Sequence, residues 1–266
     1  MPKIVAVSDL HLDWKTRGFE RGRDVLAQLR LAVEYASDVG ADLFACLGDV
    51  FDGHDPDERA WTLLGALQDE FRGLECPAII VAGNHDVVDR AGCHSAVWPL
   101  RNDGGYGRHA VFVAEGVDTY PFPDFSVVTV PHVSRAHIKA AIAVTPQEYL
   151  DAAAAHEIAL DGKWRAQMPL VALCHLEVEG ARPGAEVDMV AGERLEIPKV
   201  IRESPEVTVV LCGHIHEAQD VPRFPGGEVP AGTSAGWDPQ IHVVGTLERL
   251  TLSEAGQPKS FLELEV

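Results

Sequence analysis

The sequence predicts an α/β domain, because short apolar runs alternate with helical patterns and the runs end at polar residues. The apolar runs are rich in β-branched residues and nearly continuous, as expected of strands buried on both faces of a sheet. They cover residues 4–9, 42–49, 78–84, 126–132, 170–175 and 207–214. Helical patterns lie between several of these runs, over residues 25–40, 55–71 and 145–160. Alternation of strands and helices is typical of an α/β fold.

The helical patterns carry boundary signals. Gly40 is suited to end the first helix, since glycine readily adopts the left-handed conformation that follows many helices. Asp55 or Asp57 is suited to cap the second helix, and a Thr-Pro-x-Glu pattern from Thr145 predicts the start of the third. Beyond Val221 the chain is rich in Pro and Gly and ends in two strand-like runs, HVVGTLERLTL and KSFLELEV. No repeat or linker interrupts residues 1–266, which predicts a single domain.

Composition indicates an ordinary globular protein of the cytoplasm. Of the 266 residues, 46% are hydrophobic and 24% are charged, and no apolar run is long enough to span a membrane. The first residues lack the long apolar region of a signal peptide. The five cysteines form no CxxC pair, which favours reduced thiols over a disulfide framework or a thiolate zinc site.

The net charge of −19 argues against tight non-specific binding to nucleic acid. It does not exclude a local basic face. Lys15, Arg17, Arg21 and Arg23 form a basic cluster close to the end of the first predicted strand. This cluster is interpreted either as a solvated loop or as a contact for phosphate groups.

The polar residues at the strand ends are carboxylates, imidazoles and an amide. They are Asp9, His11, Asp49, Asn84, His175, His214 and His216. Because ligands of open α/β sheets gather at the carboxyl ends of strands, we expect these side chains to meet. The mixture suits divalent Mn, Fe or Zn, and it exceeds what one tetrahedral zinc needs. We therefore expect two ions that share a bridging carboxylate. In isolation, an HxH pair such as His214 and His216 would be as consistent with a surface turn as with a metal site.

His85 directly follows the proposed ligand Asn84, so its ring is expected beside the metals, where it would donate a proton to a leaving-group oxygen. Asp86 would either hold the tautomer of that imidazole or cap the following turn. His54 and His132 follow proposed strand ends and are candidates for lining the substrate cleft.

Five sequence blocks resemble those of the calcineurin-like metallophosphoesterase superfamily, in the same order. The blocks are DLH (9–11), GDVFD (48–52), GNHD (83–86), His175 and GHIH (213–216). The resemblance implies two packed central sheets flanked by helices, a four-layer α/β/β/α sandwich. It also implies that Asp49 bridges two metals and that His85 is catalytic. One metal would take Asp9, His11 and His216 in addition, and the other Asn84, His175 and His214.

Sequence outside these blocks resembles the nuclease domain of the Mre11/SbcD family. The similarity includes SDLHLD, the stretch from RDVLAQLRL to GDVFDG, HLEVEGA (175–181) and GHIHEAQ. It also includes residues 244–266, here named the closing segment, which resemble a G-S-x-E-R … F-x-E … K-G-F pattern. Thr246, Leu252 and Ser260 depart from that pattern.

This resemblance implies a metal-dependent DNA exo- or endonuclease acting in recombination, repair or replication. Mn²⁺ is the expected metal, with Fe²⁺, Zn²⁺ and Mg²⁺ as alternatives. The expected partners are DNA and an SMC-like ATPase of the SbcC/Rad50 type. The resemblance covers residues 1–266 with the nuclease domain alone, so we expect no separate capping domain. That compact form resembles nucleases of some phage or accessory recombination systems, which would act in the host cytoplasm.

Two other functions compete with the nuclease. The acidic balance favours a small-molecule phosphodiesterase acting on cyclic nucleotides or nucleotide diphosphates. A non-catalytic scaffold is disfavoured, because every proposed ligand is present.

A homodimer is also expected from the resemblance, and an apolar stripe of the second predicted helix is interpreted as either core or dimer face. The stripe comprises Ala60, Leu63, Leu64, Leu67 and Phe71.

Overall fold

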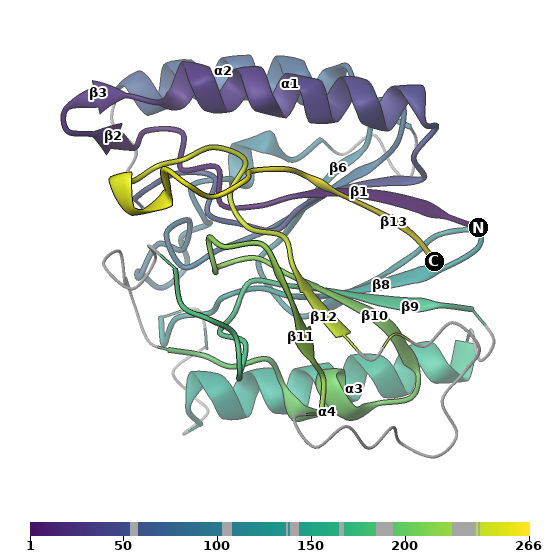
Figure 1. Cartoon of the computed structure of the whole chain (residues 1–266). Helices are drawn as coiled ribbons and strands as arrows, with labels where there is room; N and C mark the ends of the chain where they lie inside the picture. Colours follow the sequence, from purple (N-terminus) through teal and green to yellow (C-terminus); the bar gives the residue numbers. More distant parts are fainter. Residues whose placement is uncertain are drawn as a thin grey trace.

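Two β-sheets lie face to face, with helices on both outer faces, in the computed structural model of the chain (Figure 1). The structure describes residues 1–53, 58–102, 108–136, 138, 144–164, 168–184, 194–224, 238 and 240–266. His54, Asp55 and Asp57, which were considered as a cleft residue and as helix caps, lie outside this range.

The first sheet has the strand order β13-β1-β4-β5-β6. Its strands are β1 (Lys3–Val7), β4 (Leu43–Cys46), β5 (Ala78–Val81), β6 (Val111–Ala114) and β13 (Leu262–Glu265). The strands β1, β4, β5 and β6 run parallel, and β13 adds an antiparallel edge next to β1. The carboxyl ends of β1, β4 and β5 therefore share one edge.

The second sheet has the order β11-β12-β10-β9-β8-β7. Its strands are β7 (Asp118–Pro121), β8 (Ser126–Val130), β9 (Leu170–Cys174), β10 (Val207–Cys212), β11 (Gln219–Pro222) and β12 (Gln240–Val243). The central strands β8, β9, β10 and β12 are parallel, and both edge strands are antiparallel.

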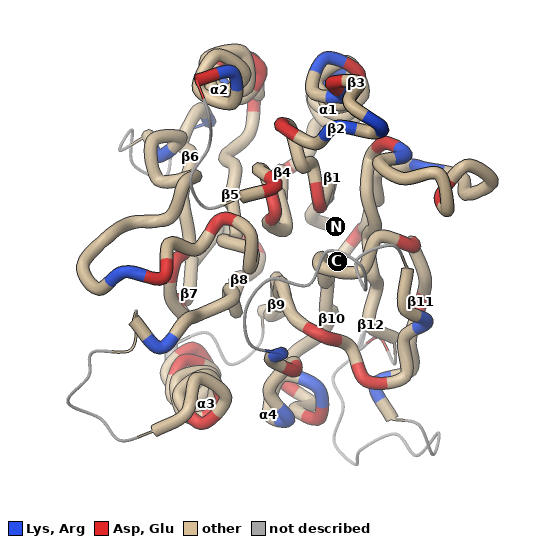
Figure 2. Tube along the Cα trace, turned by 90° about the vertical axis from the view of Figure 1, so that its left-hand side faces the viewer, with Lys and Arg blue, Asp and Glu red and all other residues tan. Residues whose placement is uncertain are grey.

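The helices form the two outer layers, as the view turned by 90° makes plain (Figure 2). The helices α1 (Gly22–Asp38) and α2 (Glu58–Arg72) lie over the first sheet, and α3 (Pro146–Trp164) and α4 (Lys199–Glu203) lie over the second. Shorter elements are a hairpin of β2 (Lys15–Thr16) and β3 (Phe19–Glu20) and the 3₁₀ turns η1 (Trp98–Leu100) and η3 (Leu252–Glu254). This arrangement confirms the predicted four-layer α/β/β/α fold.

The alternation along β1 explains why the strands read as continuous apolar runs. Ile4 and Ala6 pack in the core between the two sheets, whereas Val5 and Val7 pack in the core beneath the helices. All four side chains are fully buried, so both faces of the strand need apolar residues.

The apolar stripe on α2 belongs to the core. Ala60, Leu64, Leu67 and Phe71 are buried against the first sheet, and Leu63 is partly buried beside them. Of the two interpretations of this stripe, the contacts favour core over dimer face.

The cysteines are all free thiols, and Cys46, Cys76, Cys174 and Cys212 are buried. Burial raises the pKa of Cys76 and Cys212 to about 12, so these thiols remain protonated and unreactive at neutral pH. Among the described residues, no helix combines the length and the apolar character needed to cross a bilayer.

Candidate metal centre

The polar residues that follow the strands converge at one edge shared by the two sheets. Asp9 Oδ1 accepts a hydrogen bond of 3.1 Å from the backbone of His214, which links the end of β1 to the end of β10 across the sheet boundary. His175, after β9, donates from Nδ1 to the backbone oxygen of Leu47, after β4. These contacts join two sheets that have no shared strand.

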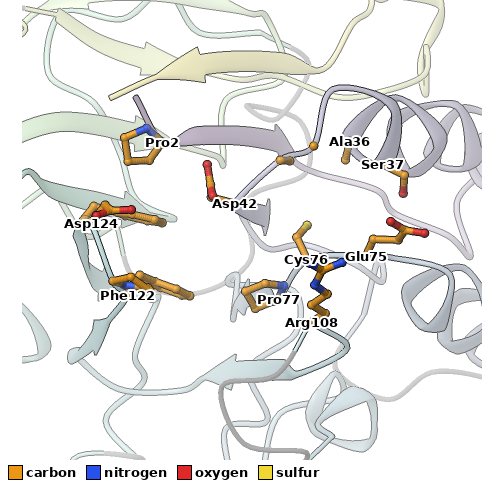
Figure 3. Close-up of a pocket in the computed structure, with 14 residues that line it drawn as sticks. Pro2, Ala36, Ser37, Asp42, Glu75, Cys76, Pro77, Arg108, Phe122 and Asp124 are labelled. Carbon is orange, nitrogen blue, oxygen red and sulfur yellow. The ribbon is translucent and has the colours of Figure 1, made fainter.

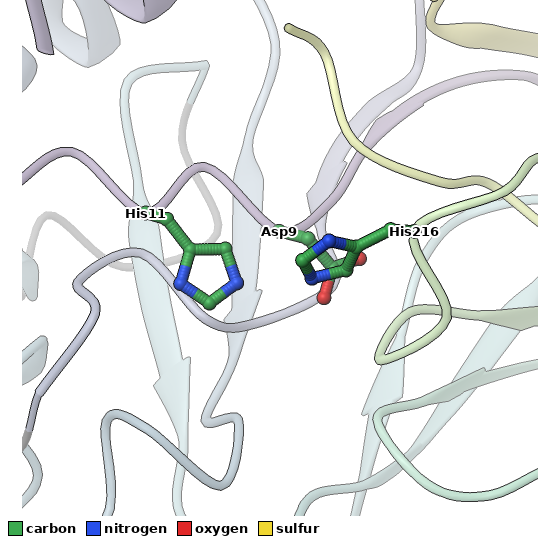
Figure 4. Close-up of side chains that lie close together, drawn as sticks. All are labelled: Asp9, His11 and His216. Carbon is green, nitrogen blue, oxygen red and sulfur yellow. The ribbon is translucent and has the colours of Figure 1, made fainter. Parts of the chain in front are cut away.

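The first group of potential ligands comprises Asp9, His11 and His216 (Figure 4). One ligand atom from each lies within 4.8 Å of the others. Their exposed fractions are only 1%, 0% and 1%. Carboxylate and imidazole groups rarely meet in a dry interior unless they pair or bind a cation.

The second group comprises Asp49, His175 and His214, again with ligand atoms within 4.8 Å of one another. The amide oxygen of Asn84 lies 2.9 Å from His214 Nδ1 and 3.1 Å from His175 Nε2. Asp49 Oδ2 lies 3.2 Å from His175 Nε2 and 3.8 Å from His11 Nε2. Asp49 therefore stands between the two groups, where a bridging carboxylate would have to be.

The residues present fit divalent cations. Within the described part of the chain, Asp9 Oδ2 and both ring nitrogens of His11 are buried and make no hydrogen bond. Leaving such atoms buried and unsatisfied costs about 1–3 kcal/mol each. A cation that accepts a lone pair from Asp9 Oδ2 and one from a single ring nitrogen of His11 would remove much of this cost. Oxygen with imidazole ligands is the set that Mn²⁺, Fe²⁺ and Zn²⁺ accept.

The backbone is strained at these positions. Asp9, His11, Asp49 and His214 have positive φ angles of 51°, 41°, 49° and 77°. Residues other than glycine rarely occupy this left-handed region, and strain of this kind gathers at functional sites. The strained turns direct side chains from strand ends into the shared edge.

Two glycines keep this edge open for the ligands. A β-carbon on Gly48, whose φ is +92°, would collide with the ring of His175, and one on Gly83 would collide with the carboxylate of Asp49. The glycines of the GDVFD and GNHD blocks are thus required by the close approach of the ligands themselves.

The charges at the centre are strongly coupled. Burial opposes the ionisation of Asp49, but the neighbouring His175, His85 and His11 outweigh it and hold its pKa well below the ordinary value. Burial likewise lowers the pKa of His175, but Asp49 outweighs it and raises that pKa to about 9. Burial dominates at His11 and lowers its pKa. The protein thus holds an ionised carboxylate among imidazoles.

His85 lies beside both groups, and its Nδ1 donates a hydrogen bond of 2.5 Å to the backbone oxygen of Asp52. Burial lowers its pKa, but Asp49 and Asp52 outweigh burial, so the pKa is raised above the ordinary value. His85 is therefore oriented by Asp52, and it retains a proton more readily than a free histidine.

Asp86 is fully buried and braces the loops. Its Oδ1 accepts hydrogen bonds from the backbones of Val50 and Phe51 at 3.0 and 3.3 Å, and its Oδ2 accepts one from Gly83 at 2.9 Å. These contacts match neither role considered for Asp86: they tie the loop after β4 to Gly83, which precedes Asp86, whereas His85 Nδ1 donates to the backbone oxygen of Asp52.

Asp52 is a site residue that sequence reasoning did not single out. Its carboxylate lies 3.6 Å from His11 Nδ1 and 3.9 Å from His85 Nδ1, and together these three form a further cluster of potential ligands. Its position as the last residue of GDVFD was the signal available in the sequence.

The residues proposed to touch substrate have different surroundings. Arg21 is tied to the closing segment, donating a 2.7 Å hydrogen bond to the backbone oxygen of Arg249 and lying 3.5 Å from Glu248. Arg17 occupies the left-handed turn of the β2–β3 hairpin, and Arg23 lines a cavity of about 600 Å³ that also borders Leu12. His132 is buried after β8, and its backbone N–H donates to Ala82.

A further cavity of about 430 Å³ lies away from this centre, around the residues that precede β1, β4 and β5 (Figure 3). Pro2, Asp42 and Pro77 line it. Since these residues stand at the amino ends of parallel strands, this cavity lies at the edge opposite to the metal centre.

Comparison with known proteins agrees with this architecture. A structure described as a dimetal phosphatase from Danio rerio has 15% sequence identity and a TM-score of 0.51, covering 92% of this chain and 87% of its own. The structure of TT1561 from Thermus thermophilus has 17% identity and a TM-score of 0.51, covering 92% and 89%. At such identities the likeness is one of fold. No curated protein matches the sequence.

The family model for calcineurin-like phosphoesterases matches residues 2–218, which include every proposed metal ligand. The chain therefore belongs to the calcineurin-like phosphoesterase family.

Proposed function

We propose that the protein is a two-metal phosphodiester hydrolase whose substrate is DNA. The observation that carries the proposal is the position of Asp49, between one group of buried ligands and another. Asp9, His11, Asp49 and His216 would hold one ion. Asp49, Asn84, His175 and His214 would hold the second.

Divalent cations, when bound, supply positive charge that polarises a phosphoryl group and acidifies water. The chain's own residues provide orientation and proton transfer. His175 donates from Nδ1 to the backbone oxygen of Leu47, so its Nε2, which faces Asp49 and Asn84, would be the atom that binds an ion. His85 donates from Nδ1 to the backbone oxygen of Asp52, so its Nε2 would be the atom that passes a proton to the departing oxygen.

Two features support DNA as the substrate. The first is the resemblance of the closing segment to the Mre11/SbcD pattern. The second is a cavity that borders Leu12, which directly follows His11, and that is lined by the cationic side chains Lys15, Arg23 and Arg59 as well as by Glu20, the partner of Arg59. We expect Mn²⁺ as the metal, an SMC-like ATPase and a second copy of the chain as partners, and the cytoplasm as the compartment.

A small-molecule phosphodiesterase is the second candidate, favoured by the net charge of −19. A small substrate requires no extended basic surface, whereas DNA is repelled by an acidic protein at low salt.

The decisive experiment compares three substrates in the presence of Mn²⁺: labelled duplex DNA, labelled single-stranded DNA and bis-p-nitrophenyl phosphate. A nuclease cleaves at least one DNA substrate with a kcat/KM well above that for the chromogenic diester. Hydrolysis of the diester without DNA cleavage would favour the second candidate, and no hydrolysis of any of the three would refute both.

A further inference from the structure

The closing segment, coloured yellow in Figure 1, contains a buried carboxylate that the proposed chemistry does not use. Glu254, in η3, has an exposed fraction of 0%. A carboxylate removed from water to this extent needs charged or hydrogen-bonding partners, because its desolvation is otherwise prohibitive.

Those partners fix the carboxylate in one position. Glu254 Oε2 accepts hydrogen bonds from the backbones of Leu250 and Thr251 at 2.9 and 2.6 Å. Glu254 Oε1 lies 2.9 Å from Nζ of Lys259, whose side chain is itself only 7% exposed. Neither Glu254 nor Lys259 can reorient without breaking several of these bonds.

The pair contacts a proposed metal ligand on two sides. Glu254 Oε1 lies 3.6 Å from Nδ1 of His216, and Lys259 Nζ donates a hydrogen bond of 3.1 Å to the backbone oxygen of His216. One buried ion pair thus faces the ring of this histidine and binds its backbone oxygen, from a segment more than thirty positions further along the chain.

The turn that begins the closing segment allows the segment to lie close to the backbone of His216. Gly245 has a φ of +72°, and a β-carbon there would lie 2.9 Å from the backbone oxygen of His216. Thr246 donates its N–H to that same oxygen at 3.2 Å and bridges to Ser8, just before Asp9. The closing segment therefore lies against both chain segments that supply the first ligand group.

We propose that Glu254, held by Lys259, is a positioning residue that sets the orientation of His216 for the metal shared with Asp9 and His11. The proposal rests on the proposed function of the centre. A carboxylate facing Nδ1 favours the tautomer with its proton on Nδ1, which leaves the Nε2 lone pair for the metal. The carboxylate also makes the imidazole more basic, and therefore a stronger metal ligand.

The effect should be confined to one metal. His175, of the second group, is oriented by the backbone oxygen of Leu47, and Nε2 of His214 lies 3.5 Å from Glu177. Within the described part of the chain, Glu254 forms no hydrogen bond or ion pair with His175 or His214. A loss of Glu254 should therefore weaken one of two binding events rather than both.

Titration calorimetry of the metal-free full chain with Mn²⁺ tests this selectivity, with Glu254→Gln compared with Glu265→Gln. Glu265 is the matched control, because it lies in the same segment and its side chain is 49% exposed. In Glu254→Gln we expect one binding event to weaken by about 10–100-fold, the usual effect of removing a carboxylate behind a ligating histidine, and the other to change less than about twofold. Glu265→Gln should bind both ions as the wild type does.

Unchanged or equally weakened binding of both ions in Glu254→Gln would overturn the inference, whereas a wild-type chain that binds fewer than two ions would overturn the proposed function instead. Spectra of the Zn²⁺-loaded wild type labelled with ¹⁵N-histidine give a second test that needs no variant to fold. His216 should carry its proton on Nδ1, and a proton on Nε2 would refute the role of Glu254.

Discussion

Asp49 Oδ1 accepts a hydrogen bond of 2.9 Å from the backbone N–H of His85. The proposed bridging carboxylate and the proposed proton donor are therefore held in a fixed relation, although they follow different strands, β4 and β5. Variants of these two residues should separate metal binding from catalysis.

Asp49→Ala should abolish both metal occupancy and turnover, because the carboxylate stands between the two ligand groups. Metal analysis of the purified variant, with phosphodiesterase assays alongside, measures both effects. Asp69→Ala removes an exposed carboxylate of α2 and should change neither. Two ions still bound to Asp49→Ala would contradict the bridging role.

His85→Ala should retain both ions and lose turnover by on the order of 10²–10⁴, the usual contribution of a positioned proton donor. The comparison of kcat at full metal occupancy measures this loss, and His94→Ala, which alters an exposed histidine, is the control. Full turnover would show that His85 is a bystander, and loss of metal would show that it is structural.

The double variant Arg17→Ala/Arg23→Ala should weaken DNA cleavage and spare the chromogenic diester, if these side chains contact phosphate groups. Exposed ion pairs contribute about 0.2–1 kcal/mol each, which corresponds to a loss of about 2- to 30-fold for two contacts. The ratio of kcat/KM for the two substrates is the measurement, with Arg72→Ala on α2 as control. Equal loss on both substrates would argue against phosphate contacts.

Arg21→Ala is expected to loosen the closing segment, because Arg21 donates a hydrogen bond to the backbone oxygen of Arg249.

Gly245→Ala should destabilise the fold by about 1–3 kcal/mol, the cost of forcing a residue with a β-carbon into the left-handed region. Urea denaturation of the metal-free protein would report a lower midpoint. Gly256→Ala is the matched control in the same segment, since its added β-carbon meets no atom within 4 Å. A midpoint equal to that of the control would mean that the turn relaxes without cost.

The start of α3 should become less stable in acid. Glu148 accepts hydrogen bonds from the backbone N–H and the hydroxyl of Thr145, at 2.7 and 3.0 Å, and these bonds lower its pKa. A lowered pKa stabilises the folded chain above the pKa of the unfolded chain, and the contribution is lost as the pH falls through the folded pKa. The Tm of Glu148→Gln should therefore differ from that of the wild type more at pH 7 than at pH 4.

The sequence allowed the elements to be predicted and the proposed ligands to be named, because both depend on local pattern. Buried parallel strands are marked by continuous apolar runs, and strand ends in one sheet must meet at one edge. The interpretation of HVVGTLERLTL as a strand was wrong beyond Val243, because Gly245 turns the chain into a left-handed conformation there.

Residues that act through contacts between distant segments could not be found in this way. Asp52 ends the GDVFD block, but the contact of its backbone oxygen with His85 is visible only in the structure. Glu254 and Lys259 read as ordinary charged residues of a surface turn until their burial is known. Arg21 and Arg23 are alike in sequence, and only the structure separates the one held by Arg249 from the one that lines a cavity.

The hydrogen bond from His214 to Asp9 joins residues 205 positions apart. A ribosome that adds about 5–20 residues per second exposes Asp9 roughly 10–40 s before His214 is made. Throughout that interval the nascent chain lacks part of each ligand group and has no complete site at which to capture ions. Hydrolytic competence therefore requires synthesis to pass His216, and no fragment that ends before His214 holds either complete ligand group.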